Sequence, residues 1–449
     1  MEYSQDLQGK QASAKAARDL GQRLEAFVQP LLIELDKQID KRLVRTFLST
    51  LQVIVQFRQG TQGLLLSELG GNLLSPDRAP AGTKRLSNLL RSQKWTWRLI
   101  AGFLWQEADV TLNDLQAAGE TALVAWDESV LEKSESIAIE GLCSVRSSKA
   151  RRLKRIKPGY FNPPGGRPIM VPGMHWLTLL LMGYRGIPRV AAMQWWTTRG
   201  QFASDRRTEE ARLLEQCART WGRRVIHVWD RGFSGGPWLS QAAQQKVRFV
   251  LRWHKGYKLV DDQGRKRKAW EITRGKRSWE HRLIWDARRR CERKTGIVAM
   301  PISHPEYEGA LWLVVSRPGK GQSPWYLVTN EPVSSPDDAW RIVFAYARRW
   351  QVEMTYRYAK SELAMQSPRL WRWENRLKLL LMATLVYAFL LSLLDSALEP
   401  LRTWLMRHWC HRTGKRNRDA SIPLYRLRSA LSRLWLAHPP PPISWANSG

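Results

Sequence analysis

Acidic side chains are scarce in this sequence. The 449 residues include 40 Asp and Glu against 72 Lys and Arg, so the formal net charge is +32 at pH 7. Such a cationic excess disfavours an enzyme for small metabolites and favours a polyanionic partner, because each neutralised phosphate releases condensed counterions. Nucleic acid is the first partner that this charge indicates, and an anionic membrane surface is the alternative.

Cysteine is also rare, with 4 residues and no CxxC pair. This spacing excludes a disulfide framework and a zinc ribbon, and it is compatible with a reducing cytosol. His408, Cys410 and His411 lie close together in the sequence. Because no second ligand cluster accompanies them, a surface segment is favoured over a metal site.

Long apolar runs are absent as well. The longest extends from Leu379 to Leu394, which is shorter than the about 20 residues that a bilayer span requires. It predicts a buried core helix and disfavours the membrane alternative. The first residues lack the basic and apolar segments of a signal peptide, so we expect a cytoplasmic protein.

What is present is a chain whose patterning changes from region to region. The basic, helical start favours a DNA-binding domain of helix-turn-helix character, with a plain helical bundle as the alternative. The predicted regions are a helical N-terminal domain at 1–118, a first α/β core part at 119–231, a β-rich insertion at 232–332, a second core part at 333–367 and a helical C-terminal region with a Pro-rich tail at 368–449.

The α/β pattern comes from short apolar runs separated by an amphipathic helix. Residues 121–129, 136–145 and 223–230 are predicted strands, and residues 206–222 are the predicted helix. Further along, Ser334 or Ser335 is a candidate N-cap before Pro336, at the start of a helix pair.

Two of the predicted strands end in acids, Asp127 and Asp230. Such acids lie in the crevice where α/β sheets bind ligands. The alternative is that each caps a turn or pairs with an Arg. Glu128 follows Asp127 directly, and we expect it to point to the opposite side of the strand.

A third group of polar residues has helical spacing. At about 100° per residue, Tyr346, Arg349, Glu353 and Lys360 share an arc of roughly 60° on one helical face. A solvated charged face is the alternative interpretation, but it does not account for the strand-ending acids that precede the group.

The spacing Tyr-x2-Arg-x3-Glu-x6-Lys resembles the YREK signature of the insertion-sequence-4 group of DDE transposases. The segments WDES, VWDRGF and WYLVTNEP look like the flanks of that group's acidic residues. The resemblance covers residues 121–365 well and is weak over both helical ends.

This resemblance implies an α/β fold with an RNase H-like catalytic core interrupted by the β-rich insertion. Asp127, Asp230 and Glu353 would be the catalytic, metal-binding triad. Phosphodiester hydrolysis needs an activated water and a stabilised leaving oxygen, which two divalent ions provide. Carboxylate and phosphate oxygens suit Mg²⁺, for which Mn²⁺ can substitute.

The resemblance also implies DNA contacts. Tyr346, Arg349 and Lys360 would contact DNA-end phosphates, and Trp325 would stack on a flipped base while a DNA hairpin forms. Basic runs at 265–277, 288–294 and 412–418 suggest a long DNA path. A further run supplies the candidate DNA-binding residues Lys149, Arg151, Arg152, Lys154, Arg155 and Lys157.

Together these patterns predict a cut-and-paste DNA transposase. It would bind double-stranded DNA, both the terminal inverted repeats of its element and the target, at the bacterial nucleoid. Pairing of two ends implies a homodimer in a synaptic complex, with the C-terminal helices as the expected contact. The alternatives are a catalytically silent DNA-binding protein derived from a transposase, and an RNase H-like structure-specific nuclease.

Overall fold

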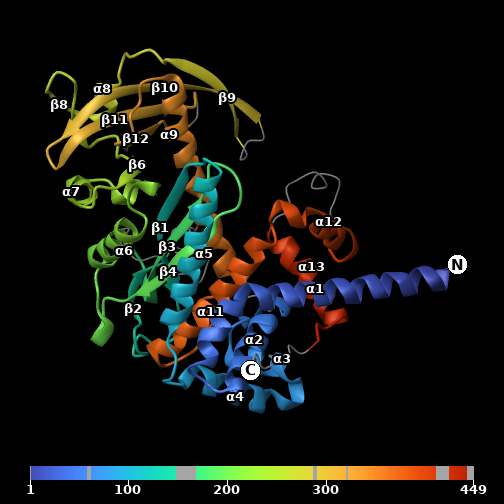
Figure 1. Ribbon diagram of the computed structural model, residues 1–449. Coiled ribbons are helices and arrows are strands. Elements are labelled where there is room, and N and C mark those ends of the chain that lie inside the picture. The colour runs from blue at the N-terminus through green and yellow to red at the C-terminus, as the bar shows by residue number, and fades with distance from the viewer. Residues whose placement is uncertain are drawn as a thin grey trace, which may run out of the picture.

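The computed structural model describes residues 2–57, 62–147, 168–286, 291–319, 322–410 and 424–441. Within these residues one sheet of 12 strands extends through the molecule, and helices from both ends of the chain pack together beside it (Figure 1). The predicted α/β class is confirmed, with a large mixed sheet at its centre.

The central part of the sheet has an antiparallel half and a parallel half. Its strands are β1 (Ala122–Glu132), β2 (Cys143–Arg146), β3 (Met170–Met182), β4 (Arg189–Trp196), β5 (Val225–Trp229) and β6 (Arg248–Arg252). β3 pairs antiparallel with β1, β2 and β4. β1 pairs in parallel with β5, and β5 pairs in parallel with β6.

Helices cover both faces of this central sheet, because β1 is apolar on both sides. The side chains of Ala122, Val124 and Trp126 pack with α6 (Arg206–Thr220) and α7 (Gly236–Gln244). The alternate side chains, Leu123 and Ala125, belong to the other hydrophobic cluster, which includes the helices that follow β12. Asp127 and Glu128 therefore extend toward opposite faces, as predicted for Glu128.

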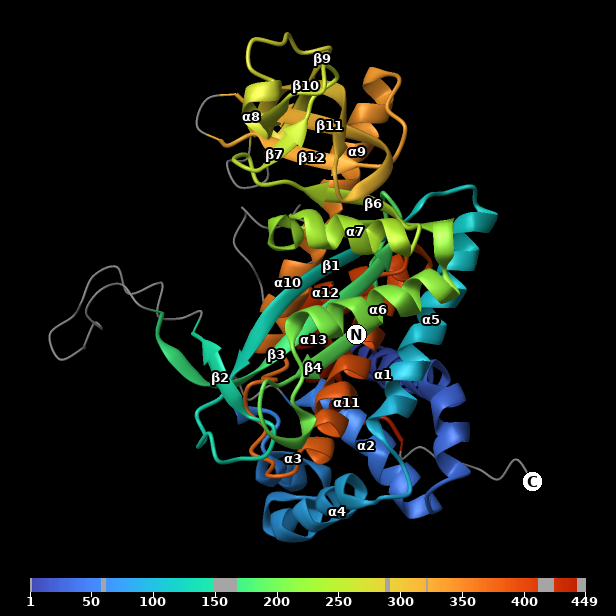
Figure 2. The same cartoon turned by 90° about the vertical axis from the view of Figure 1, so that its left-hand side faces the viewer.

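The remaining strands continue the same sheet. They are β7 (Lys258–Val260), β8 (Lys266–Lys268), β9 (Glu280–Asp286), β10 (Cys291–His304), β11 (Tyr307–Arg317) and β12 (Trp325–Thr329), with the short α8 (Ala269–Ile272). β12 pairs with β6, so the sheet has no break between the central strands and this upper part (Figure 2). Residue 232, the predicted start of the insertion, lies between β5 and α7, inside a β-α-β unit.

One predicted strand is wrong in its first half. Residues 137–140 form turns and bends, and only residues 143–145 of the predicted 136–145 strand belong to β2, which continues to Arg146. The turn is held from outside, since the Glu140 carboxylate accepts the Trp373 N–H at 2.6 Å and the Glu140 carbonyl accepts Arg376 at 3.0 Å. These contacts come from a helix more than two hundred residues later.

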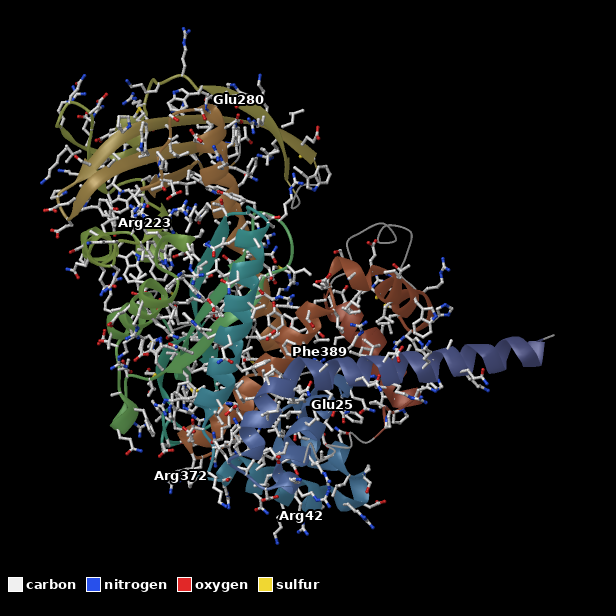
Figure 3. All side chains as sticks on the ribbon, viewed as in Figure 1. Glu25, Arg42, Arg223, Glu280, Arg372 and Phe389 are labelled. Atoms are coloured by element: carbon white, nitrogen blue, oxygen red, sulfur yellow. The ribbon has the colours of Figure 1, made fainter. Side chains whose placement is uncertain are left out.

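The N-terminal and C-terminal helices form one helical body. They are α1 (Glu2–Asp36), α2 (Lys41–Gln56), α3 (Leu66–Leu73), α4 (Ala79–Arg91), α5 (Trp97–Ala117), α11 (Trp373–Ser392), α12 (Glu399–His408) and α13 (Leu424–Ala437). Phe389 of α11 lies inside this body, with its ring 6.0 Å from that of Phe27 on α1 (Figure 3). Buried Arg428 of α13 donates to the carbonyl oxygens of Val55 and Phe57 at the end of α2.

Helix α11 contains the longest apolar run of the sequence. By length and composition it is the one helix of the described residues that could cross a membrane, but 89% of its most apolar window is buried inside the protein. The prediction of a buried core helix is confirmed.

Two further helices connect the sheet to this body. α9 (Pro336–Arg348) begins with Ser335 as N-cap, which accepts the Asp338 N–H at 3.2 Å, so this part of the prediction is confirmed. α10 (Trp350–Ser361) follows after an interruption at Arg349.

Candidate active site

Asp127 and Asp230 lie next to each other because of the register between β1 and β5. The parallel pairing ends with Ala125 opposite Val228, and each acid follows two residues later. Two-residue periodicity then places the two carboxylates on the same side of neighbouring strands. The two carboxylates are also close enough to repel each other, since the charge of Asp230 contributes to raising the pKa of Asp127.

Helix α10 contributes Glu353, because it packs on the face of the sheet that carries Asp127. The helix packs against β1 and β3, and its Tyr356 hydroxyl donates to the carbonyl oxygen of Asp127. Further along both elements, the Lys360 Nζ of α10 donates to the Ser129 hydroxyl of β1 at 2.7 Å. Ser129 shares the strand face of Asp127, so α10 extends along the row of residues that carries the first acid.

A single guanidinium joins two of the three acids. Arg349 Nη1 lies 2.9 Å from Asp127 Oδ2, and Nη2 lies 2.8 Å from Glu353 Oε1. The Arg349 side chain is only 10% exposed. A buried, forked ion pair of this kind is geometrically specific.

The environment of Asp127 disfavours its negative charge. Burial is the main cause that raises its pKa to about 7, and repulsion from Asp230 and Glu353 adds to it. Arg349 and the backbone N–H of Glu128, which donates to Asp127 Oδ1 at 2.9 Å, oppose this. The site therefore needs positive charge close to Asp127 to keep three carboxylates ionised together.

The donor set fits a hard divalent cation. Carboxylate oxygens suit Mg²⁺ or Mn²⁺, and the mutual repulsion of the acids is what a cation would relieve. Among the described residues, however, no group of three His, Cys, Asp or Glu is close enough to hold one ion. In this conformation the Arg349 guanidinium supplies the positive charge between Asp127 and Glu353.

Residues 201–389 match the family described as a transposase DDE domain. The matched range contains Asp230, Arg349 and Glu353, and it begins after Asp127. No curated protein matches the chain. Among solved structures, the chain is similar to the cryo-EM structure of a piggyBac transposase synaptic complex with hairpin DNA, with 14% sequence identity and a TM-score of 0.39 over 94% of this chain and 84% of that chain.

Within the matched range, the four residues of the predicted helical face do not lie on one continuous helix. Tyr346 lies on α9, Glu353 and Lys360 lie on α10, and Arg349 is the residue between the two helices. The Arg349 N–H bonds to the Tyr346 carbonyl, and the Val352 N–H bonds to the Arg349 carbonyl. Such bonds over three residues tighten the chain locally and change the direction of the side chains.

Tyr346 and Trp325 form a contact of their own beside Arg349. Their rings are 5.0 Å apart at an angle of 72°, and the Arg349 guanidinium lies 5.8 Å from the Tyr346 ring. Arg252 of β6 donates to the Tyr346 hydroxyl at 3.4 Å. Tyr346 is buried and Trp325 is partly buried. In this conformation the tyrosine hydroxyl accepts from a protein cation, Arg252.

Other predicted residues lie outside this cluster. The basic run with Lys149, Arg151, Arg152, Lys154, Arg155 and Lys157 falls outside the described residues, as does His411. The sequence did not indicate Tyr356, which donates to the Asp127 carbonyl, or Ser129, which accepts from Lys360. It also did not indicate Arg206 and Glu210 behind the strand. The spacing of Arg206 and Glu210 on one helix was a visible signal, but their partner on β1 was not.

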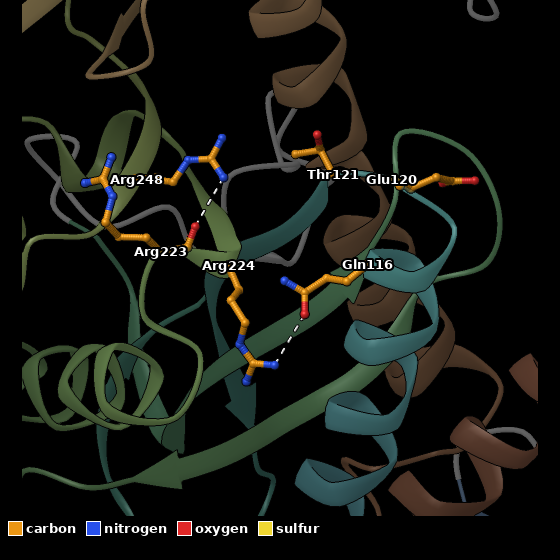
Figure 4. A pocket seen from close by; sticks show the side chains of 7 residues that line it. Gln116, Glu120, Thr121, Arg223, Arg224 and Arg248 are labelled. Carbon is orange, nitrogen blue, oxygen red and sulfur yellow. Dashed lines mark hydrogen bonds between the residues drawn. The ribbon is translucent and has the colours of Figure 1, made fainter.

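A hollow lies at the N-terminal end of β1, whereas Asp127 lies in the middle of that strand (Figure 4). It measures about 510 Å³ and has the lining residues Gln116, Gly119, Glu120, Thr121, Arg223, Arg224 and Arg248. Two of its arginines are engaged with the protein, because Arg224 donates to Gln116 at 3.4 Å and Arg248 donates to the Arg223 carbonyl at 3.2 Å. It is basic but separate from the acidic cluster.

Proposed function

We propose that this protein is a DNA transposase that cleaves and joins DNA with Asp127, Asp230 and Glu353. The observation that carries the proposal is the convergence of β1, the end of β5 and α10 around Arg349, in a chain whose residues 201–389 match a transposase DDE domain. The three carboxylates come from segments that are far apart in the sequence, so chance local clustering does not account for them.

The proposed catalytic core is RNase H-like. The strand order β4-β3-β1-β5-β6, with antiparallel pairs on one side of β1 and parallel pairs on the other, supports this assignment. In this core, Asp127 lies on β1 and Asp230 directly follows β5, which are the two central parallel strands, and Glu353 is carried by α10, which packs over β1. In the same proposal, the strands from β7 to β12 are the insertion of the insertion-sequence-4 group.

The proposed chemistry is metal-dependent. Two bound divalent ions would activate water and stabilise the leaving 3′ oxygen. Asp127, Asp230 and Glu353 would hold them, and the fixed Glu128 N–H would orient one oxygen of Asp127. Arg349 would then turn from the carboxylates to a DNA phosphate, which its fork can grip with two hydrogen bonds.

The proposed substrate is double-stranded DNA at the terminal repeats of the element, and the reaction is cut-and-paste transposition through a DNA hairpin. The net charge of +32 supports the polyanionic partner. Trp325, next to Tyr346 and Arg349, would stack on the base extruded during hairpin formation. Two protomers would pair two ends in the bacterial cytoplasm.

The test uses a labelled duplex that carries the terminal repeat found in the DNA flanking the gene. Wild-type protein and Glu353→Gln are incubated with it in Mg²⁺, and products are resolved on native and denaturing gels. Cleavage at the repeat boundary by the wild type alone supports the proposal, and a hairpin product fixes the route. Tight binding without cleavage in Mg²⁺ or Mn²⁺ would identify a catalytically silent DNA-binding protein. Cleavage independent of the repeat would identify a structure-specific nuclease.

A further inference from the structure

Behind the sheet, one arginine contacts the chain beside both strand-borne acids. Arg206 is the first residue of α6, on the face of β1 opposite to Asp127. Its Nε lies 2.6 Å from Glu128 Oε2 and 2.8 Å from Glu210 Oε1, and its Nη2 donates to the Gly232 carbonyl at 3.3 Å. Arg206 thus connects β1 to the loop that follows β5.

Two of the residues that Arg206 contacts, Glu128 and Gly232, donate hydrogen bonds to the acids. The Glu128 N–H donates to Asp127 Oδ1 at 2.9 Å, and the Gly232 N–H donates to Asp230 Oδ1 at 2.5 Å. Each acid therefore has one oxygen held by a backbone amide. Arg206 contacts the same two residues through other groups, the Glu128 carboxylate and the Gly232 carbonyl. Arg206 therefore links the two residues whose amides hold the acids.

Arg206 is itself firmly held. Glu210 is fully buried and also pairs with Arg207 at 3.0 Å, while the Arg206 guanidinium lies 5.5 Å from the Phe233 ring. Burial raises the pKa of Glu128 and of Glu210, and the guanidinium opposes this in both. Removal of Arg206 would leave two carboxylates close together without their shared cation.

The loop after Asp230 leaves little room for adjustment. A Cβ on Gly232 would lie 2.8 Å from Asp230 Oδ1 and 3.4 Å from Arg206 Nη2. The first distance is too short for a real contact, so a side chain here would force the Asp230 carboxylate to move.

We propose that Arg206 is a positioning residue that sets the separation of the Asp127 and Asp230 carboxylates from the reverse face of the sheet. The proposal rests on the proposed function, in which these two acids hold the metal ions. Partners behind metal ligands typically change metal affinity or activity by 10–100-fold when they are removed. A lysine carries the charge but lacks the planar fork, so it cannot reach Glu128 and Gly232 together.

The test compares full-length Arg206→Ala, Arg206→Lys and Gly232→Ala with the wild type and with Arg212→Ala. Arg212 lies on the same helix and pairs with Glu209, away from the acids, so it is the matched control. Mn²⁺ affinity is measured by electron paramagnetic resonance with the terminal-repeat duplex bound, alongside duplex affinity, unfolding temperature and cleavage in Mg²⁺.

We expect duplex affinity within about twofold of wild type for all variants. Mn²⁺ affinity should fall by about 10–100-fold in Arg206→Ala and Gly232→Ala, less in Arg206→Lys, and not in Arg212→Ala. Wild-type Mn²⁺ affinity in a folded Arg206→Ala protein would overturn the proposal. If Arg206→Ala does not fold, wild-type Mn²⁺ affinity in a folded Arg206→Lys protein would overturn it instead. A wild-type protein that binds Mn²⁺ but never cleaves DNA would reject the proposed function and leave the positioning result to stand by itself.

Discussion

Arg349 binds Asp127 at 2.9 Å while its second arm binds Glu353 at 2.8 Å. The guanidinium thus occupies the position between two proposed metal ligands. In the proposed function, metal ions at these acids would compete with the guanidinium for the same carboxylates. Metal binding would then require Arg349 to move, and a DNA phosphate is a group that could bind it instead.

This competition gives the first prediction. Arg349→Ala should raise the Mn²⁺ affinity of the DNA-free protein severalfold, because the competing cation is gone, while cleavage of the repeat duplex falls by about 100-fold or more. Titration followed by electron paramagnetic resonance measures the affinity. Unchanged or weaker Mn²⁺ binding by a folded variant would show that Arg349 does not shield the acids.

The second prediction concerns the triad itself. Asp127→Ala, Asp230→Ala and Glu353→Ala should each reduce cleavage by at least about 1,000-fold and leave duplex binding nearly intact, because each removes a proposed metal ligand. Gel assays of binding and cleavage measure both properties. Asp262→Ala, on an exposed turn, is the control and should cleave normally. Full cleavage by any triad variant would remove that acid from the site.

The third prediction follows from the pKa of Asp127, raised from 3.8 to about 7. Between these values the folded protein binds a proton that the unfolded chain has released, so this carboxyl's contribution to stability falls as pH rises from about 4 to 7. Asp127→Asn cannot titrate. Its metal-free stability relative to wild type should therefore increase over this range, by at most about 1.4 kcal/mol per pH unit. Denaturant unfolding at several pH values measures the difference, and a constant difference would contradict the assignment.

The fourth prediction concerns Trp325, whose ring lies 5.0 Å from that of Tyr346. Trp325→Ala should leave the first nick unchanged and slow hairpin formation by about 5–150-fold, the equivalent of a base stack worth roughly 1–3 kcal/mol. A time course on denaturing gels separates the two steps. Trp285→Ala, an exposed tryptophan on β9, is the control. A normal hairpin rate in Trp325→Ala would refute the role.

Local patterns in the sequence were sufficient to predict the elements that carry the acids. Apolar runs ending in Asp127 and Asp230 predicted β1 and β5, although β1 continues past Asp127 to Glu132, and the Ser335–Pro336 pair predicted the start of α9. Arg349 joins Asp127 to Glu353, and Asp230 is close enough to raise the pKa of Asp127, but the catalytic role of the three acids stays a prediction.

What the sequence could not indicate depends on contacts between distant segments. The turn at 137–140 is held by α11, and Arg206 finds Glu128 only after β1 and α6 have packed. A helix pair was predicted for this segment, but the break at Arg349 was not located, because both flanking segments have good helical patterns and the break depends on a single residue. The pairing of β12 with β6, which makes the sheet continuous, has no local signal in either strand.

The shared core of α2 and α13 has a consequence for the order in which the protein matures. The carbonyl groups at the end of α2 are covered by Arg428, and the indole of Trp435 donates to the Ala17 carbonyl of α1 at 3.2 Å. Arg428 is synthesised 373 residues after Val55, and Trp435 is synthesised 418 residues after Ala17. Helices α1 and α2 therefore leave the ribosome long before α13 and gain their final packing only when α13 arrives.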